Sequence, residues 1–165
     1  MTPVRTPADS VLQLRAAVRN DALRLAQIHA TDPDGAWTEK DIASWIAHPY
    51  CRTAVATYGT PEDIAGFALV LEAGDDAEIL AIAVDPPYRS QGVGTMLLNW
   101  LDPLCASMSL QRWVLEVAQD NMPAQRLYGK LGFIVVACRS KYYHRASGAV
   151  DAYVMSAPVG HLSRS

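Results

Sequence analysis

The chain lacks a long apolar segment, a signal peptide and a regular cysteine pattern. No apolar stretch among its 165 residues is long enough to cross a bilayer, so we expect a soluble protein that does not associate with membranes. Its three cysteines, Cys51, Cys105 and Cys138, lie far apart and form no Cys-x-x-Cys pair. Because an odd number of scattered cysteines indicates no disulfide framework, the sequence favours a protein of the reducing cytoplasm.

The chain also lacks an excess of positive charge and a cluster of metal ligands. Its 14 Lys and Arg face 17 Asp and Glu, which gives a formal net charge of -3. This balance argues against nucleic-acid binding through a broad basic face, although it is compatible with a small basic patch. The four histidines, His29, His48, His144 and His161, are scattered, so no metal site is predicted.

Half of the residues are hydrophobic, which suits one globular domain with a sizeable core. We expect this domain to span residues 12–159, between an N-terminal arm of residues 1–11 and a tail of residues 160–165, both loosely ordered. Apolar periodicity and turn-forming clusters predict the order β-α-α-β-β-β-α-β-α-β-β. The predicted fold class is therefore α/β, with a mixed sheet covered by helices. The expected strands are residues 12–18, 53–58, 64–71, 77–84, 113–117, 133–138 and 152–157.

Capping residues mark three of the four expected helices. Asp21 can cap the first helix, and Thr38 with Asp41 resembles a capping box that opens the second. Asn121 can cap the short fourth helix, which Gly132 ends.

The third helix is expected to pack one apolar stripe on the sheet. Pro103 lies inside this pattern and removes a backbone hydrogen bond, so we expect a bend near Asn99 or an early end of the helix. The stripe consists of Val93, Met96, Leu97, Trp100, Leu101, Leu104 and Cys105.

The segment from Arg89 to Gly94 predicts an anion site. The preceding apolar run ends in Asp-Pro-Pro, and Gly92 and Gly94 then allow the backbone to approach a ligand where a helix begins and directs free N–H groups at it. The third glycine of a dinucleotide loop and the lysine of a P-loop are both absent, so neither fold is indicated. Taken alone, the loop fits a helix that merely begins with a flexible turn equally well.

Several motifs, in the same order along the chain, resemble those of the GCN5-related N-acetyltransferases (GNAT). They are Ile82-Ala-Val84, Arg89-Ser-Gln-Gly-Val-Gly94, Leu115-Glu-Val117, Asn121 and Leu127-Tyr-Gly-Lys-Leu-Gly-Phe133. Within this superfamily the chain is most similar to the RimI type, which acetylates the N-terminal alanine of a ribosomal protein. The further matching segments are Trp37-Thr-Glu39, Asp76-Ala-Glu-Ile-Leu80, Tyr142-Tyr143 and Asp151-Ala152. The resemblance extends from Leu14 to Pro158 and implies a mostly antiparallel, twisted sheet flanked by helices.

The resemblance implies acetyl-coenzyme A as the cosubstrate. Its pyrophosphate would bind amides at the helix N-terminus, with the side chains of Arg89 and Thr95 as possible contacts. Its pantetheine arm would pair with one strand as an added strand would, and an amide there could hold the thioester oxygen. Asn121 could contact this arm as well as cap its helix. The implied coenzyme-binding residues are Ile82, Ala83, Val84, Arg89, Ser90, Gln91, Gly92, Val93, Gly94, Thr95 and Asn121.

Acetyl transfer to an amine also requires a base and an acid. Glu116 lies in a strand where Trp113, Leu115 and Val117 point to the opposite face, and burial would make this carboxylate a useful base. Periodicity alone fits a solvent-facing acid on an edge strand equally well. The resemblance favours catalysis, because the RimI-type base occupies this position.

Tyr128, on the following short helix, matches the general acid of the family. A phenol with an ordinary pKa of about 10 keeps its proton at neutral pH and can donate it to a thiolate. The helical spacing of Leu127, Tyr128 and Leu131 by itself fits an ordinary core residue.

The acceptor is expected to be a protein N-terminus of the ribosomal-protein alanine type. An α-amine has a pKa of about 7.7–8.0 against about 10.4 for lysine, so a carboxylate deprotonates it more easily. Trp37, Tyr142, Tyr143 and Asp151 are the implied acceptor-site residues.

Three departures from the RimI pattern stand out. Ala81 replaces a usual Asn and Val150 a usual acidic residue, which both bear on acceptor specificity, while Ser90 replaces an Arg near the phosphates. Two other functions stay open: a GNAT enzyme that acetylates a small amine, such as a polyamine, an amino acid or an antibiotic, and a non-catalytic acyl-coenzyme A-binding module.

Overall fold

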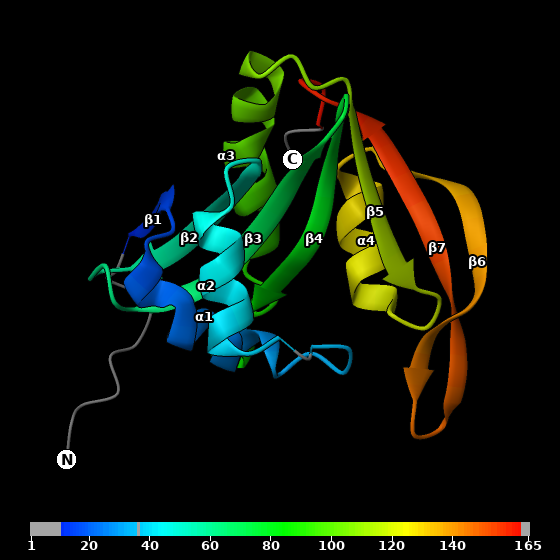
Figure 1. The fold of residues 1–165 in the computed structure, drawn as a ribbon, viewed down its shortest axis with the longest axis horizontal. Helices are drawn as coiled ribbons and strands as arrows, with labels where there is room; N and C mark the ends of the chain where they lie inside the picture. Colours follow the sequence, from blue (N-terminus) through cyan, green and yellow to red (C-terminus); the bar gives the residue numbers. More distant parts are fainter. Residues whose placement is uncertain (1–10, 36, 163–165) are drawn as a thin grey trace.

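The computed structural model describes residues 11–35 and 37–162, which form one twisted sheet between two layers of helices (Figure 1). The seven strands follow the order β1-β2-β3-β4-β5-β7-β6, and all neighbours are antiparallel except β4 and β5. The predicted fold class and element order are confirmed.

The strands are β1 Leu12–Ala16, β2 Cys51–Tyr58, β3 Ile64–Ala73, β4 Asp76–Val84, β5 Arg112–Ala118, β6 Ile134–Arg145 and β7 Gly148–Pro158. The helices are α1 Ala22–His29, α2 Glu39–Ala47, α3 Val93–Ser107 and α4 Met122–Lys130, with 3-10 turns at Arg19–Asp21 and Pro86–Tyr88.

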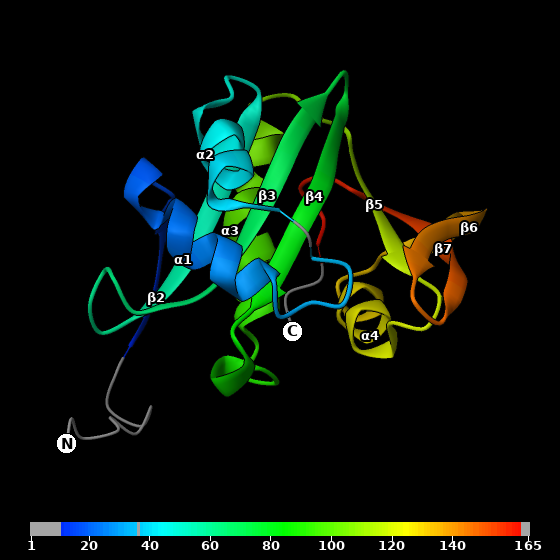
Figure 2. The same ribbon diagram turned by 60° about the horizontal axis from the view of Figure 1, so that its bottom comes forward.

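Each face of the sheet buries its own apolar core. The helices α1 and α2 cover one face through Ile28 and Ile42 (Figure 2). On the other face, α3 packs Leu97 and Leu101 against the strands, and Trp113 of β5 is fully buried there. Burial of these stripes provides the main stabilising free energy of such an arrangement. Among the described residues, no helix is long and apolar enough to span a membrane.

Two of the three predicted caps form as expected. The Thr38 hydroxyl accepts the Asp41 N–H at 3.2 Å while the Asp41 carboxylate accepts the Thr38 N–H at 2.8 Å, and Asn121 Oδ1 accepts the Ala124 N–H at 3.2 Å. Asp21 does not cap α1 with its side chain. A 3-10 turn precedes the helix, so Asp21 already has helical backbone angles, and its carboxylate instead accepts the Val18 N–H at 2.8 Å.

The helix α3 differs from its predicted stripe. Met96 is 40% exposed, whereas Leu98 and Asp102 are buried. Pro103 does not end the helix early, because the helix continues to Ser107 and buries Cys105. Tertiary packing here outweighs the backbone hydrogen bond that proline removes.

Asp102 ties the C-terminal segment to the core. Its Oδ1 accepts the Trp113 indole N–H and the Gly160 N–H, both at 2.8 Å. Leu162 is buried nearby. The chain expected to be loose from residue 160 is therefore packed at least to Leu162, while residues 1–10 and 163–165 of the expected arm and tail lie outside the described residues.

A bulge in β4 creates the gap that holds the site. Val70 pairs with Ile79 and Leu69 with Ala81, so Leu80 is an extra residue in β4. A bulge bends its strand and moves the following side chains to the other face. Ile79 accordingly packs in the core beneath α3, whereas Ala81 packs in the core beneath α1 and α2. The parallel pairing of β4 with β5 ends at Ile79 and Leu115, and the two strands separate beyond it.

Candidate active site

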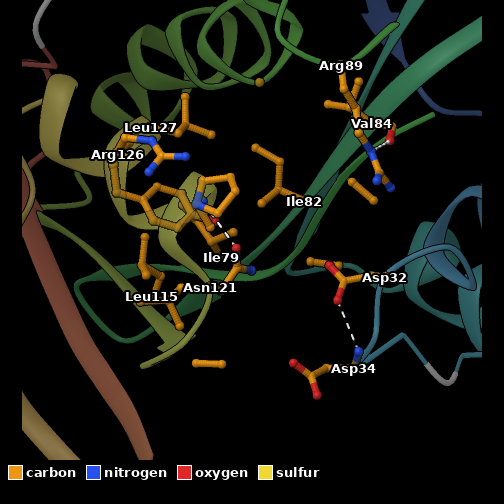
Figure 3. A pocket seen from close by; sticks show the side chains of 18 of the residues that line it. Asp32, Asp34, Ile79, Ile82, Val84, Arg89, Leu115, Asn121, Arg126 and Leu127 are labelled. Carbon is orange, nitrogen blue, oxygen red and sulfur yellow. Dashed lines mark hydrogen bonds between the residues drawn. The ribbon is translucent and has the colours of Figure 1, made fainter. Parts of the chain in front are cut away.

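A cavity of about 750 Å³ opens where β4 and β5 separate (Figure 3). Its walls come from the second half of β4, the N-terminus of α3, the end of β5, the helix α4 and the loop between α1 and α2. Tyr143 of the β6–β7 hairpin completes the wall. The cavity therefore brings together segments from nearly the whole length of the chain.

The loop before α3 has the geometry of an anion cradle. Ser90 and Gly92 have left-handed backbone angles, with φ of 61° and 80°. The first helical hydrogen bond runs from the Met96 N–H to the Gly92 carbonyl at 3.0 Å. The N–H groups of residues 93–95 thus have no partner inside the helix and are available to a ligand.

Glycine is required at Gly92 and at Gly94 for different structural reasons. A Cβ on Gly92 would meet nothing within 4 Å, so this position requires glycine for its positive φ. A Cβ on Gly94 would lie 2.9 Å from Leu127 Cδ2, so Gly94 permits close packing of α3 on α4. Together they give a loop with room for a diphosphate and a helix N-terminus directed at it.

The side chain of Arg89 connects this loop to the loop between α1 and α2. Its Nε donates to the Val84 carbonyl at 3.0 Å, and its terminal nitrogen donates to Thr31 Oγ1 at 2.9 Å. Arg24 of α1 reinforces the connection through an ion pair of 2.6 Å with Asp85. In this arrangement Arg89 holds protein groups together.

The free edge of β4 offers main-chain groups to the cavity. The Asp85 N–H donates to the Ala65 carbonyl at 2.8 Å, so it faces β3. Because successive strand residues direct their main-chain groups to opposite edges, those of Val84 and Ile82 face the gap and those of Ala83 face β3. Two of the three predicted strand residues therefore present backbone groups to a ligand.

Glu116 lies in the cavity wall with its side chain 21% exposed. The expected alternation of β5 is confirmed, because Trp113, Leu115 and Val117 are buried in the core beneath α3 and α4. The carboxylate is largely buried but is not in purely apolar surroundings. Arg139 Nη1 lies 3.1 Å from Glu116 Oε1, so the carboxylate has a cationic partner.

Tyr128 is buried on α4 and also lines the cavity. Burial raises the pKa of its phenol, and the nearby Tyr143 and Asp32 raise it further. A phenol in this environment stays protonated at neutral pH, as a proton donor to a departing thiolate must.

A bulge in β6 sets the conformation of the β6–β7 hairpin. Arg139 pairs with Ala152, but the next pair joins Tyr143 to Val150, and Lys141 in the bulge has φ of 53°. The Lys141 N–H donates to Asp151 Oδ1 at 2.8 Å, which stabilises the bulge. Both final strands are longer than predicted, because pairing resumes beyond this irregularity.

Arg145 ties the β6–β7 hairpin to two neighbouring loops. Its guanidinium donates to both carboxylate oxygens of Asp34, at 3.0 Å and 2.7 Å, and also pairs with Asp120. These contacts join the hairpin, the loop between α1 and α2, and the loop between β5 and α4. Bidentate pairs of this kind fix orientation as well as charge.

Comparison with known proteins identifies the family. The sequence model described as the acetyltransferase (GNAT) family matches residues 22–133, more than half of the chain. The chain belongs to the GNAT acetyltransferase family. As a GNAT enzyme it is an N-acetyltransferase that depends on acetyl-coenzyme A.

Within the GNAT family the chain is similar to the ribosomal protein bS18-alanine N-acetyltransferases. It is 34% identical to the Escherichia coli K12 enzyme over 123 residues, which cover 74% of this chain and 81% of the relative. A putative enzyme of the same name from Bacillus subtilis is 32% identical over 149 residues, or 87% and 96% of the two chains.

Solved structures show the same GNAT fold. The crystal structure of the Escherichia coli ribosomal-protein-S18-alanine N-acetyltransferase superposes with a TM-score of 0.81 at 28% identity, covering 93% of this chain and 97% of that one. Arabidopsis thaliana NAA60 in complex with acetyl-coenzyme A superposes with a TM-score of 0.80 at 20% identity, over 90% and 99% of the chains.

Most residues predicted to bind the coenzyme line this GNAT cavity. The exception is Gln91, whose side-chain amide donates to the Pro87 carbonyl at 3.1 Å. Both predicted catalytic residues, Glu116 and Tyr128, also line it. The predicted residues in the wall are Ile82, Ala83, Val84, Arg89, Ser90, Gly92, Val93, Gly94, Thr95 and Asn121.

The predicted acceptor residues are only partly brought together. Tyr143 lines the cavity, and its hydroxyl donates to the Glu116 carbonyl at 3.3 Å. Tyr142 is 42% exposed beside the Glu116 carboxylate, which raises the pKa of the Tyr142 phenol. Trp37 does not line the cavity; its ring packs between His29, which does line it, and Trp45, with ring centroids 5.0 Å and 5.9 Å away.

Sequence analysis missed four charged residues of the cavity wall. Asp32 and Asp34 come from the loop between α1 and α2, and Arg126 comes from α4 (Figure 3). Lys130, also on α4, is the fourth. The basic pair has a visible signal, because residues four apart share one face of a helix. The acidic pair lies in a turn-forming Asp-Pro-Asp-Gly segment that gives no indication of what it faces.

Proposed function

We propose that this enzyme acetylates the α-amine of a protein N-terminus, of the ribosomal-protein alanine type, with Glu116 as the general base and Tyr128 as the general acid. The observation that carries the proposal is a single continuous cavity lined by the helix N-terminus, the free edge of β4, Glu116 and Tyr128. The similarity to bS18-alanine N-acetyltransferases over most of the chain supports the choice of acceptor.

Acetyl-coenzyme A fits the donor side of the cavity. Its pyrophosphate suits the amides of residues 93–95, where the helix dipole favours negative charge. Its pantetheine arm suits the main-chain groups of Ile82 and the Val84 N–H, as an added strand would, whereas the Val84 carbonyl already accepts from Arg89 Nε. The cosubstrate supplies the thioester, and the protein supplies binding, orientation and proton transfer.

The reaction requires two proton movements. Glu116 takes a proton from the acceptor ammonium, directly or through water, and the free amine attacks the thioester carbonyl. A main-chain N–H of β4 stabilises the negative oxygen that develops. As the C–S bond breaks, Tyr128 donates its proton to the departing thiolate, and the proton lost from the nitrogen restores the phenol. The products are an N-acetylated acceptor and free coenzyme A.

An N-terminal acceptor suits this carboxylate better than a lysine does. The α-amine has a pKa of about 7.7–8.0, so a substantial share of it is already neutral near physiological pH. Glu116 therefore needs to remove a proton from only part of the bound acceptor. A lysine, with a pKa of about 10.4, would demand a much stronger base.

The direct test is acetyl transfer to a peptide that begins with alanine, compared with a panel of free polyamines, amino acids and aminoglycosides. We expect the peptide to be turned over with the highest kcat/KM, and the same peptide with a blocked N-terminus not to be turned over. Preference for a free small amine would replace the proposal with the small-molecule alternative. Coenzyme binding without turnover of any amine would indicate a binding module.

A further inference from the structure

Three carboxylates line the cavity, and two of them already have a cationic partner. Asp34 is held by both donors of Arg145, and Glu116 lies 3.1 Å from Arg139. The third, Asp32, accepts the Asp34 N–H at 3.0 Å through Oδ1 and forms no ion pair with any Lys, Arg or His of residues 11–35 and 37–162. Asp32 is thus the cavity carboxylate without an ion-pair partner within the described chain, and its charge acts on His29 of the cavity wall, where it opposes the lowering of the imidazole pKa by burial.

Asp32 lines the same cavity as Tyr128 and Tyr143. Its negative charge contributes to raising the pKa of the Tyr128 phenol, after burial and Tyr143. It also contributes, after burial, Asp34, Tyr142 and Glu116, to raising the pKa of Tyr143 to about 12. Figure 3 shows Asp32 on the side of the cavity away from Arg126. In the proposed mechanism the Tyr128 phenol protonates the thiolate that the attacking nitrogen displaces. The Asp32 carboxylate, which acts on this phenol, would therefore also act on the attacking amine.

The loop that carries Asp32 is fixed at both ends. Arg89 holds Thr31 at 2.9 Å, and Arg145 holds Asp34. Gly35 closes the turn, because a Cβ there would lie 1.8 Å from the His29 carbonyl oxygen. A carboxylate held in this way does not have to become ordered when a ligand binds, so more of its interaction free energy contributes to affinity.

We propose that Asp32 captures the acceptor as its ammonium ion and orients it toward the thioester before Glu116 removes the proton. The proposal rests on the proposed function and assigns a further acceptor-binding residue to it. An uncompensated carboxylate in a partly enclosed cavity attracts a cation more strongly than one in bulk water does. Asp151, the acid expected from sequence, does not line the cavity, and its Oδ1 accepts the Lys141 N–H.

Asp32→Asn tests this role, because the amide keeps the shape of the side chain and removes its charge. We expect KM for the acceptor to rise about tenfold or more, as for the loss of a charge-assisted hydrogen bond, with an unchanged coenzyme Kd. Asp32→Glu should recover part of the loss. Asp75→Asn, in the exposed turn between β3 and β4, is the matched control and should leave both constants unchanged.

The pH profile separates capture of a cation from a merely structural role. The Asp32 carboxylate stabilises the ammonium form and so raises the pKa of the bound amine. Removing the charge lowers that pKa, so the acidic limb of kcat should move to lower pH in Asp32→Asn. A structural defect would lower activity at all pH values without moving this limb.

The acceptor used for these measurements is whichever amine the wild-type enzyme turns over. If that amine is a small molecule, the proposed N-terminal substrate is wrong, yet Asp32 is still tested on it. An unchanged acceptor KM and an unmoved acidic limb in folded Asp32→Asn would overturn the role of Asp32 and leave the proposed function intact. Turnover of no amine by the wild-type enzyme would overturn both proposals.

Discussion

The donor side and the acceptor side of the cavity are built in different ways. The donor side is formed mainly by one continuous stretch, from Ile79 in β4 to Thr95 in α3, and acts through main-chain groups. The acceptor side is assembled from the loop between α1 and α2, the end of β5 and the β6–β7 hairpin. In the proposed mechanism it acts through charged side chains, and Arg89 and Arg145 hold its segments together.

The two sides differ in the kind of protein group that would bind the ligand. A diphosphate and a pantetheine arm can be bound by amides, so the donor side tolerates many side chains as long as the backbone keeps its path. The acceptor must be recognised by its own charge and shape, which requires particular side chains. Substitutions on the donor side should therefore change coenzyme affinity, and those on the acceptor side should change acceptor KM or turnover.

The largest effect is expected at Tyr128, where the two sides meet. Tyr128→Phe should lower kcat by about 10²- to 10⁴-fold, because the thiolate then leaves without its general acid. The coenzyme Kd, measured by calorimetry, should not change. Tyr50→Phe, at an exposed position outside the cavity wall, is the control. A variant with wild-type kcat would remove Tyr128 from the mechanism.

The next largest effect is expected from Gly92→Val, which should weaken coenzyme binding and leave acceptor binding unchanged. Gly92→Val places a β-branched residue at φ of 80°, which costs about 1–2 kcal/mol and disturbs the amides of the loop. The coenzyme Kd should rise roughly 5- to 30-fold, while acceptor KM at saturating coenzyme stays the same.

Gly74→Val controls for strain as such. Gly74 also has a positive φ, of 63°, and nothing lies within 4 Å of its Cβ position, but it is in the turn between β3 and β4. We expect similar destabilisation with no change in coenzyme Kd. Equal losses of coenzyme affinity in the two variants would contradict a special role for the loop before α3.

A smaller effect is expected from Arg145→Leu, which should weaken acceptor binding and leave coenzyme binding unchanged. Arg145→Leu releases the β6–β7 hairpin from Asp34 and Asp120, so acceptor KM should rise several-fold and the hairpin should become more sensitive to limited proteolysis. Arg112→Leu breaks a comparable pair with Asp76 far from the cavity and should do neither. A higher coenzyme Kd in Arg145→Leu would show that the two sides are not separable.

The smallest effect is expected from alkaline pH. The pKa values of Tyr128 and Tyr143 are both raised, mainly by burial, with that of Tyr143 at about 12. The protonated phenol of Tyr128 therefore persists as pH rises through 10.0, the ordinary value for tyrosine, and kcat should show no fall below that pH. A loss of kcat centred near pH 9, with the enzyme still folded by circular dichroism, would contradict the assignment of a buried tyrosine as the acid.

The contrast between the donor side and the acceptor side also explains how much of the site the sequence could predict. Gly92 and Asn121 act within a few residues of their partners, so local patterns identified the donor loop and the helix that follows β5. The bulge at Leu80 was missed because β4 reads as an unbroken apolar strand, and the bulge becomes visible only in its pairing with β3.

Long-range partners explain the misses on the acceptor side. Asp34 and Arg145 are 111 positions apart, and neither has a local signal for the other. Glu116 was expected in apolar surroundings, but Arg139 comes from an edge strand whose bulge the sequence does not reveal. Trp37 remains a predicted acceptor residue, although its ring stacks on His29 and does not line the cavity.

The most direct test of the account is the position of the acetyl group on a mixed acceptor. A peptide that begins with alanine and contains an internal lysine offers both amines at equal concentration, and tandem mass spectrometry locates the product. We predict acetylation of the α-amine, with the lysine unmodified at early times. Acetylation of the lysine, or transfer only to an added free polyamine, would contradict the assignment of this site to protein N-termini.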